Sequence, residues 1–321
     1  MSAKSGVNKH QPRNSFEDVQ PSLFHSIIMP ASEIMANFRK DGAHVQSHLQ
    51  VQASDIPSLA RLQTVHGVPR EVIYDLVLAN RILAHYSVLD TFGHISVRHK
   101  STNTNEDCYI QAAYRAPASV ELKDIAIFRI SDSESADEHD QRKGPLEKHL
   151  HAAIFRARPD IQAILHCHAP SLVTFSILPQ TSPARLRPVV HVGASTGASV
   201  PIYEIREHNG DGTDLLIKTP GLGDDLAKKF EADVRMVLMR GHGATIASVQ
   251  GVKDLVHKGI YAVLNATIYK DAILLSGAMG GEVPVRTLSK EEVEACGDHV
   301  TAVQRSWPAW IEELGEETGL N

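Results

Sequence analysis

The amino-acid sequence predicts an α/β fold. The chain has 321 residues, 42% of them hydrophobic and 22% charged, so it is long enough to bury a sizeable core. Segments with helical periodicity alternate with short apolar or alternating segments that are typical of strands. Between them we find no glycine-rich βαβ fingerprint of a dinucleotide-binding unit. We therefore expect helices and strands to be mixed throughout the chain.

The composition argues against several classes of protein. The net charge is −6, from 32 basic and 38 acidic residues, so we do not expect a nucleic-acid partner. No apolar run approaches the roughly 18–20 residues of a membrane helix, and the N-terminus lacks the apolar core of a secretory signal. Cys108, Cys167 and Cys296 are too few for a disulfide framework and favour a reducing compartment. We therefore expect a cytoplasmic protein without a membrane segment.

Two parts are expected along the chain. Residues 1–22 are polar and lack periodicity, which is typical of a mobile tail. An extension follows that we expect to pack on the main domain through short apolar patches, at 23–29 and 59–62. From Pro69 onward, apolar residues recur with helical spacing. We therefore divide the chain into a tail and extension, 1–66, and a main domain, 67–321.

The elements of the main domain follow from their periodicity. Helical spacing predicts helices from 69 to about 83, at 146–157, after Pro170, at 223–230, at 253–275 and at 289–305. Alternating or continuously apolar segments predict strands at 94–99, 108–111, 161–168, 187–193, 200–205 and 234–240. Residues 131–144 carry many charged side chains and predict an exposed loop.

Two histidines end the strand predicted at 161–168. Side chains of a strand alternate between its faces, so His166 and His168 project to the same side while Cys167 points away. Two neutral imidazoles side by side suit a divalent metal, which needs at least one further ligand. Two surface histidines at a strand end are the alternative interpretation. We interpret Cys167 as a small packed residue.

Two other residues could complete a metal site. His242 follows the apolar strand 234–240 and stands between two glycines, which permit a tight turn. Glu147 stands at the start of the helix that precedes the His166 strand. Three imidazoles and a carboxylate would hold Zn²⁺, our first expectation, or Fe²⁺, Mn²⁺ or Co²⁺. Glu147 could instead be a first-turn carboxylate that the helix dipole favours.

Several segments together resemble the class II aldolase/adducin family. The segment 151–170, HAAIFRARPDIQAILHCHAP, resembles the core block of that family, with Glu147 four residues before His151. The segment GHISVR at 93–98 resembles an early block, and MRGHG resembles the block that carries a third histidine. The resemblance implies an αβα fold around a mostly antiparallel sheet. It also implies a metal held by His166, His168 and His242, with Glu147 as ligand or acid/base, and C4 tetramers with active sites between subunits.

The sequence departs from the sugar-phosphate aldolases of that family. Where those enzymes have small hydroxyl or amide donors for phosphate, this chain has Ala113 to Pro117, Gly144 to Leu146, and His94 in place of an asparagine. Arg115 is instead a candidate for catalysis and substrate binding, because a guanidinium is a natural bidentate partner for a carboxylate, although it could form a structural ion pair. His94 is a candidate for catalysis and substrate contact, or a hydrogen-bonded core histidine. Tyr114 and Ser96 are further candidate substrate contacts.

These departures resemble a decarboxylase branch that acts on hydroxylated aromatic or heteroaromatic dicarboxylates. His151 could orient Glu147 from one helical turn away. His191 and His257 have weaker claims, and we interpret Tyr261 and Tyr269 as packing residues.

Four functions are compared on this basis. The first is a metal-dependent decarboxylase of a small, non-phosphorylated, hydroxylated and aromatic carboxylic acid. The second is a metal-dependent retro-aldolase on a hydroxy-oxo acid, which would break a different carbon–carbon bond. A metal-dependent oxygenase and a non-catalytic, adducin-like scaffold are the others. Four convergent ligands would be of no use to a scaffold, so we prefer a carbon–carbon lyase with a carboxylate substrate.

Overall fold

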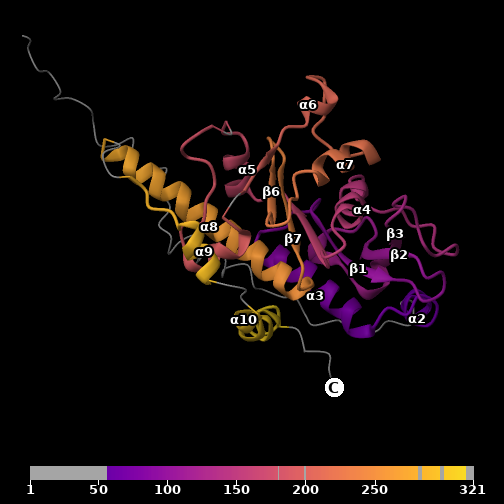
Figure 1. Cartoon of the computed structure of the whole chain (residues 1–321). Coiled ribbons are helices and arrows are strands. Elements are labelled where there is room, and N and C mark those ends of the chain that lie inside the picture. The colour runs from indigo at the N-terminus through magenta and orange to yellow at the C-terminus, as the bar shows by residue number, and fades with distance from the viewer. Residues whose placement is uncertain (1–55, 180, 199, 281–283, 297–299, 316–321) are drawn as a thin grey trace, which may run out of the picture. The chain divides into compact units, whose positions relative to one another are not determined.

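The computed structural model describes residues 56–179, 181–198, 200–280, 284–296 and 300–315 (Figure 1). The polar tail predicted at 1–22 and the apolar patch at 23–29 lie outside the described residues. The second patch lies in the described helix α2, Ile56–Thr64, where Leu59 and Leu62 are buried in the core. The boundary expected after residue 66 stays a prediction.

A seven-stranded sheet lies at the centre of the described fold, in the order β3-β2-β1-β4-β7-β6-β5. Every neighbouring pair is antiparallel except β5 and β6, which are parallel. The strands are β1 His94–Lys100, β2 Asp107–Ala112, β3 Ile125–Arg129, β4 Ala163–Cys167, β5 Ile202–Tyr203, β6 Met236–Met239 and β7 Gly243–Ser248. The α/β fold class and the mostly antiparallel sheet are therefore confirmed.

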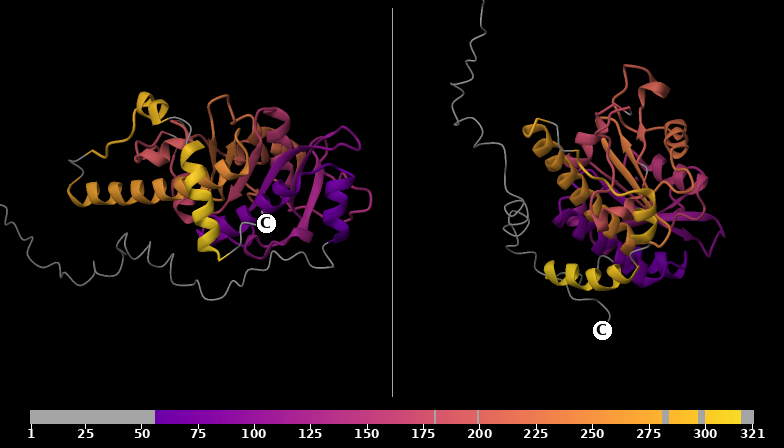
Figure 2. Two further views of the ribbon diagram at one scale, coloured as in Figure 1. Left: turned by 90° about the horizontal axis from the view of Figure 1, so that it is seen from below. Right: turned by 60° about the vertical axis from the view of Figure 1, so that its left-hand side comes forward.

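Helices cover both faces of this sheet, as Figures 1 and 2 show. The helices besides α2 are α3 Arg70–His85, α4 Lys148–Ala157, α5 Pro170–Ser176, α6 Arg206–Asn209, α7 Pro220–Ala227, α8 Val252–Ala278, α9 Lys290–Cys296 and α10 Val300–Glu313. Short 3-10 helices lie at η2 Pro117–Ser119, η3 Leu122–Asp124 and η4 His191–Thr196. Among the described helices, none is long and apolar enough to cross a membrane.

Two apolar cores separate the faces of the sheet. Alternate residues of one strand belong to different cores: Leu165 packs with α3, α5 and α8, whereas Ile164 packs with α4 and α7. His166 therefore projects toward α4, because side chains of a strand alternate. His94 lies directly opposite His166 in the antiparallel pair of β1 and β4. The sheet register thus brings the polar side chains of both strands to the start of α4.

The prediction of a strand at 187–193 is wrong. The segment instead leads into η4, and its backbone is hydrogen-bonded by a side chain of α8 rather than by a neighbouring strand. Asn265 accepts from the Val189 amide at 2.8 Å and donates to the Arg187 carbonyl at 2.9 Å. Pro188 between them has no amide to donate. One side chain therefore satisfies backbone groups that a sheet would otherwise have paired.

The other predicted elements differ mainly in extent. The helix predicted at 289–305 is described as two helices, α9 and α10, and the residues between them lie outside the description. The helix predicted from Pro69 begins one residue later, with Pro69 at its N-cap. The strands β3 and β7 have no counterpart among the predicted strands. The loop at 131–144 is confirmed as irregular, although Asp137 within it is buried against Arg61 of α2.

Candidate metal centre

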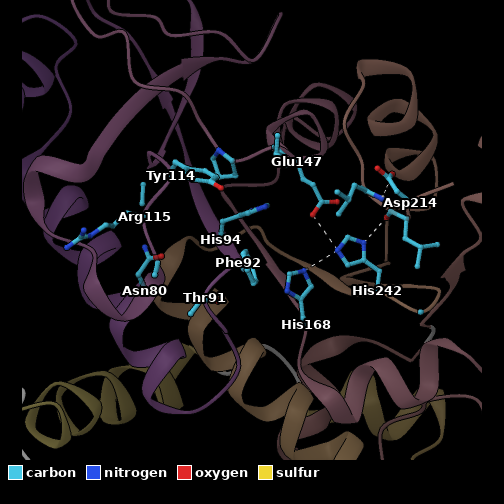
Figure 3. A pocket seen from close by; sticks show the side chains of 18 residues that line it. Asn80, Thr91, Phe92, His94, Tyr114, Arg115, Glu147, His168, Asp214 and His242 are labelled. Carbon is cyan, nitrogen blue, oxygen red and sulfur yellow. Dashed lines mark hydrogen bonds and ion pairs between the residues drawn. The ribbon is translucent and has the colours of Figure 1, made fainter.

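Three histidines and one carboxylate direct their ligand atoms to one point beside the sheet. One ligand atom from each of Glu147, His166, His168 and His242 lies within 4.8 Å of the others. His168 Nε2 lies 3.0 Å from His166 Nε2 and 3.1 Å from His242 Nε2. Glu147 Oε2 lies 3.3 Å from His166 Nε2 and 3.4 Å from His242 Nε2. The structure thus brings together the four residues predicted as metal ligands, of which Figure 3 shows Glu147, His168 and His242.

Three separate elements supply these ligands. His166 and His168 come from the end of β4, and Glu147 is the residue directly before α4. His242 lies in the tight turn between β6 and β7, where Gly241 has a φ of 65°. A Cβ added to Gly243 would lie only 2.1 Å from the Cys167 carbonyl oxygen. The glycines therefore allow the turn to approach β4 closely enough for His242 to reach the other ligands.

The spacing of these atoms fits a single divalent ion. Zinc–nitrogen bonds of about 2.0–2.1 Å in a tetrahedral site place ligand atoms roughly 3.3 Å apart. The four distances of 3.0 to 3.4 Å agree with that spacing. A mixed nitrogen and carboxylate set also suits Fe²⁺, Mn²⁺ or Co²⁺.

The outer nitrogen of each ring contacts a group that can fix its tautomer. His242 Nδ1 donates to the Leu215 carbonyl at 2.9 Å, and His168 Nδ1 donates to the Asp90 carboxylate at 3.0 Å. His166 Nδ1 lies 3.4 Å from the Thr245 hydroxyl. A neutral imidazole that donates from Nδ1 keeps a lone pair on Nε2. At least two of the convergent nitrogens are therefore prepared to bind a cation.

Glu147 stays ionised in this environment. Burial by itself would raise the pKa of Glu147, but the adjoining His166 and His242 rings hold the pKa far below its usual value. Its other oxygen, Oε1, accepts the Ile217 amide at 2.8 Å. Burial lowers the pKa of His166 to about 4, so this ring is neutral near pH 7. One carboxylate beside three imidazoles is a suitable donor set for a divalent ion.

A cavity of about 590 Å³ opens beside the four ligands. Its lining includes Glu147, His168 and His242, together with His94 from the start of β1. Three of its larger side chains are mostly exposed at its mouth: Phe92, Tyr114 and Leu146. The metal centre is therefore reachable by a small molecule.

Arg115 lines the same cavity on the side opposite the metal ligands (Figure 3). Its Nε donates to the Ser119 carbonyl at 3.0 Å and lies 3.5 Å from the Asp124 carboxylate. The side chain is 46% exposed. Arg115 thus has the structural ion pair that was its alternative interpretation, and it also borders the cavity. Tyr114 beside it is 77% exposed and has a φ of 27°.

The structure places Ser96 and His151 behind the cavity. Ser96 is fully buried and is absent from the lining, so its expected substrate contact has no support. Its hydroxyl lies 2.7 Å from His151 Nδ1, and His151 Nε2 lies 2.6 Å from His94 Nδ1. His151 was expected to orient Glu147, but among the described residues its hydrogen-bonding partners are Ser96, His94 and Gln111.

The remaining candidates lie outside the cavity lining. Tyr269 stacks on Phe175 at a centroid distance of 5.4 Å, and the ring of His257 lies 4.5 Å from that of Tyr261. Cys167 is fully buried, which raises the pKa of its thiol to about 12, as expected of a small packed residue. His191 lies at the start of η4. These contacts are packing contacts.

Several residues of the site were not predicted from the sequence. They are Asn80, Asp90, Thr91, Phe92, Gln111, Asp214 and Leu215, which line the cavity or hold a ring in place. Most of them come from loops or contact the site through the backbone. Such contacts leave no recurring pattern in one sequence. Only the nearness of Asp90 and Phe92 to the GHISVR segment could have pointed to them.

Comparison with known proteins identifies related sequences. Residues 74–262 match the class II aldolase and adducin N-terminal domain. Decarboxylase tropJ of Talaromyces stipitatus is 30% identical over 253 residues, which cover 74% of this chain and 91% of that protein. A 3,4-dihydroxyphthalate decarboxylase of Arthrobacter keyseri is 30% identical over 192 residues, or 57% of this chain and 70% of that protein.

Solved structures share the fold. An aldolase II superfamily protein from Pseudomonas syringae aligns with a TM-score of 0.57 and 21% identity, over 77% of this chain and 94% of that chain. An L-fuculose 1-phosphate aldolase from Glaciozyma antarctica aligns with a TM-score of 0.56 and 16% identity, over 76% of this chain and 90% of that chain. At these identities the similarity concerns the fold alone.

Proposed function

The chain belongs to the class II aldolase and adducin family, and we propose that it is a metal-dependent decarboxylase of a small hydroxylated aromatic carboxylic acid. Membership confirms the resemblance predicted from the sequence. The family and the two relatives named as decarboxylases support a lyase of the aldolase and decarboxylase type. The metal requirement, the substrate class and the residue roles are our proposal.

One observation carries this proposal: four ligand atoms converge beside an open cavity. His166, His168 and His242 would bind the metal, with Glu147 as the fourth ligand. When bound there, a divalent ion, with zinc as the first candidate, would polarise the oxygen atoms of a chelating substrate. The low pKa of Glu147 favours a role as a ligand or proton acceptor, because a carboxyl group that stays ionised cannot donate a proton.

The other wall of the cavity supports a carboxylate substrate. In the described part of the chain, Arg115 forms its hydrogen bond and its ion pair through Nε, so its two terminal nitrogens can form bidentate hydrogen bonds with a carboxylate. The phosphate-binding segments of a sugar-phosphate aldolase are replaced by residues such as Ala116, Pro145 and Leu146, which have no side-chain donor. Arg115 would hold the carboxylate, with Tyr114 beside it and His94 facing the ring substituents.

The assembly and location of the protein are part of the same proposal. Phe92, Tyr114 and Leu146 are 74%, 77% and 64% exposed around the mouth of the cavity. Large apolar side chains in such a cluster are typical of surfaces that another molecule covers. We propose a homotetramer whose active sites lie between subunits, and a cytoplasmic location as expected from the cysteine content.

The test combines metal analysis with product analysis. Protein purified without chelator should contain about one divalent metal per chain and release CO₂ from at least one member of a panel of hydroxylated aromatic acids. In D₂O, one deuterium should appear at the carbon that lost CO₂. His166→Ala should lose both metal and activity. An aldehyde or pyruvate-like fragment without CO₂ would instead identify a retro-aldolase.

A further inference from the structure

A buried chain of polar side chains leads from the sheet to the cavity. It consists of Gln111 on β2, His151 on α4 and His94 on β1, with Ser96 of β1 beside them. All four side chains are at most 6% exposed. They lie on the α4 side of the sheet, and only His94 also lines the cavity. A contact made deep in the fold can therefore act on the cavity through His94.

The donors and acceptors in this row of polar side chains can be assigned from its hydrogen bonds. The Gln111 amide nitrogen has no lone pair to offer, so it donates to His151 Nε2 at 3.1 Å. His151 Nε2 is then unprotonated, and His151 Nδ1 carries the proton and donates to the Ser96 hydroxyl at 2.7 Å. Because His151 Nε2 is an acceptor, His94 Nδ1 must donate to it across 2.6 Å.

The same reasoning fixes the remaining nitrogen of His94. His94 is only 6% exposed and the partner of its Nδ1 is an unprotonated imidazole nitrogen, so burial favours the neutral ring. A neutral ring with its proton on Nδ1 has a lone pair on Nε2. Figure 3 shows the His94 ring projecting toward the side chains of Glu147 and His168. The cavity therefore contains a hydrogen-bond acceptor close to the metal ligands.

We propose that His94 Nε2 accepts a hydrogen bond from a hydroxyl group of the substrate and so selects hydroxylated over O-methylated or deoxygenated compounds. This inference rests on the proposed function, because it concerns the substrate of the same site. His151 and Gln111 are positioning residues that hold the proton on His94 Nδ1. A site that is built to hydrogen-bond a substrate hydroxyl strongly rejects analogues without it, since its own polar atom is then left unpaired.

Binding of matched small molecules tests the selection. The probes are 3,4-dihydroxybenzoate and its two mono-O-methyl ethers, measured by calorimetry on the zinc-loaded protein. One ether should bind roughly tenfold or more weakly, because a buried acceptor loses its hydrogen bond. In His94→Phe the difference in affinity between the dihydroxy acid and this ether should fall to within about twofold. If the ether bound more weakly only because it chelates the metal less well, the difference would persist in the variant. His94→Gln, which has an amide oxygen that can accept, should recover part of the difference.

A matched pair of variants tests the positioning role. His151→Phe should reduce the preference for the hydroxyl group although His94 itself is retained. His149 lies two residues earlier on α4 and contacts a serine in the same way, with Nδ1 3.2 Å from the Ser133 hydroxyl. Among the described residues, His149 neither lines the cavity nor forms a hydrogen bond with a residue that does, so His149→Phe should keep the wild-type preference. If both variants lost the preference for the hydroxyl group equally, His151 would be a packing residue, and its role in positioning His94 would be overturned.

Nitrogen NMR of histidine-labelled protein tests the tautomer without any ligand. The signal assigned by comparison with His94→Gln should show a protonated Nδ1 and an unprotonated Nε2. A proton on Nε2 would mean that the chain runs in the opposite direction and would overturn the inference. Failure of all three probes to bind would overturn the hydroxyl selection. Release of CO₂ by the wild type without discrimination between the ethers would overturn the inference but leave the proposed function standing.

Discussion

The carboxylate of Asp90 accepts a hydrogen bond from His168 Nδ1 at 3.0 Å and thereby orients one of the proposed metal ligands. The same carboxylate accepts the amides of Phe92 and Gly93 at 2.9 and 2.8 Å. Burial opposes ionisation, but these two amides and the nearby His168 ring lower the pKa of Asp90. Asp90 therefore couples the metal centre to the loop that carries Phe92 into the mouth of the cavity.

Asp90→Ala should weaken metal binding. Groups that hold the outer nitrogen of a ligating histidine typically contribute about 10- to 100-fold to metal affinity. We expect a zinc dissociation constant higher by about that factor, measured by competition with a chelating dye. Asp90→Asn should lose less zinc affinity, because its amide oxygen can still accept the hydrogen bond from His168 Nδ1. Asp75→Ala, which removes a carboxylate paired with Lys253 instead, is the control. Wild-type affinity in Asp90→Ala would contradict the orienting role.

Arg115→Lys should impair the reaction while retaining the positive charge. A lysine offers no planar fork for a carboxylate, so a bidentate contact is lost. A charge-assisted hydrogen bond contributes on the order of 1.5–3 kcal/mol, or about ten- to a hundredfold in kcat/KM. Steady-state kinetics on the best acid of the panel provide the measurement. Efficient cleavage of a sugar 1-phosphate by the wild type would contradict the carboxylate role of Arg115.

The ion pair between α2 and the charged loop should make stability depend on pH. Asp137 accepts two hydrogen bonds from Arg61, at 2.7 and 2.5 Å, and these lower the pKa of Asp137 to about 2. A carboxyl group with a depressed pKa stabilises the fold above its unfolded pKa of about 3.9, and this contribution is lost as the pH falls toward 2. We expect the Asp137 carboxylate to contribute about 1–2 kcal/mol to the free energy of unfolding at pH 6. This figure is already reduced for the partial exposure of Arg61.

Urea unfolding at pH 6 and pH 3 measures this contribution. Asp137→Asn should lower the unfolding free energy at pH 6 and make its pH dependence shallower. Asp224→Asn, at the mostly exposed pair with Arg156, should change little, because surface ion pairs contribute little. An unchanged pH profile in Asp137→Asn would show that the pair does not stabilise α2.

Much of the metal centre could be predicted from local pattern. Strand alternation places His166 and His168 on one face of the sheet, and the glycines around His242 indicate a turn. The chain from Gln111 to His94 could not be predicted, because it depends on which strands are neighbours and on where α4 crosses them. The strand β7, GATIAS, was missed because its small side chains give little apolar contrast. The prediction of a strand at 187–193 was wrong because the side chain of Asn265, which is distant in sequence, forms hydrogen bonds with the backbone of that segment.

Light scattering should give a mass about four times the chain mass of 35.1 kDa. Besides the cavity mouth, the end of α8 exposes Leu274, Leu275 and Met279 by 63%, 62% and 64%. Charged substitutions such as Leu274→Lys with Leu275→Glu should dissociate the assembly, because apolar surface no longer covers apolar surface. Glu138→Lys, in the exposed charged loop, is the control. A fully active monomer would refute composite active sites.

Glu147→Gln separates the charge of the fourth ligand from its shape. The amide nearly matches the carboxylate in size, and its oxygen could still accept the Ile217 amide that now bonds Oε1. It cannot balance the cation or take part in proton transfer. We expect retained metal at saturating zinc and a rate at least ~100-fold lower, the lower end for a positioned acid or base. Glu134→Gln is the matched control, because Glu134 pairs with Lys148 at the start of the same helix without lining the cavity. Metal content by elemental analysis and CO₂ release should be measured on the same samples. A variant that keeps both metal and rate would remove Glu147 from the chemistry and leave the three histidines as the centre.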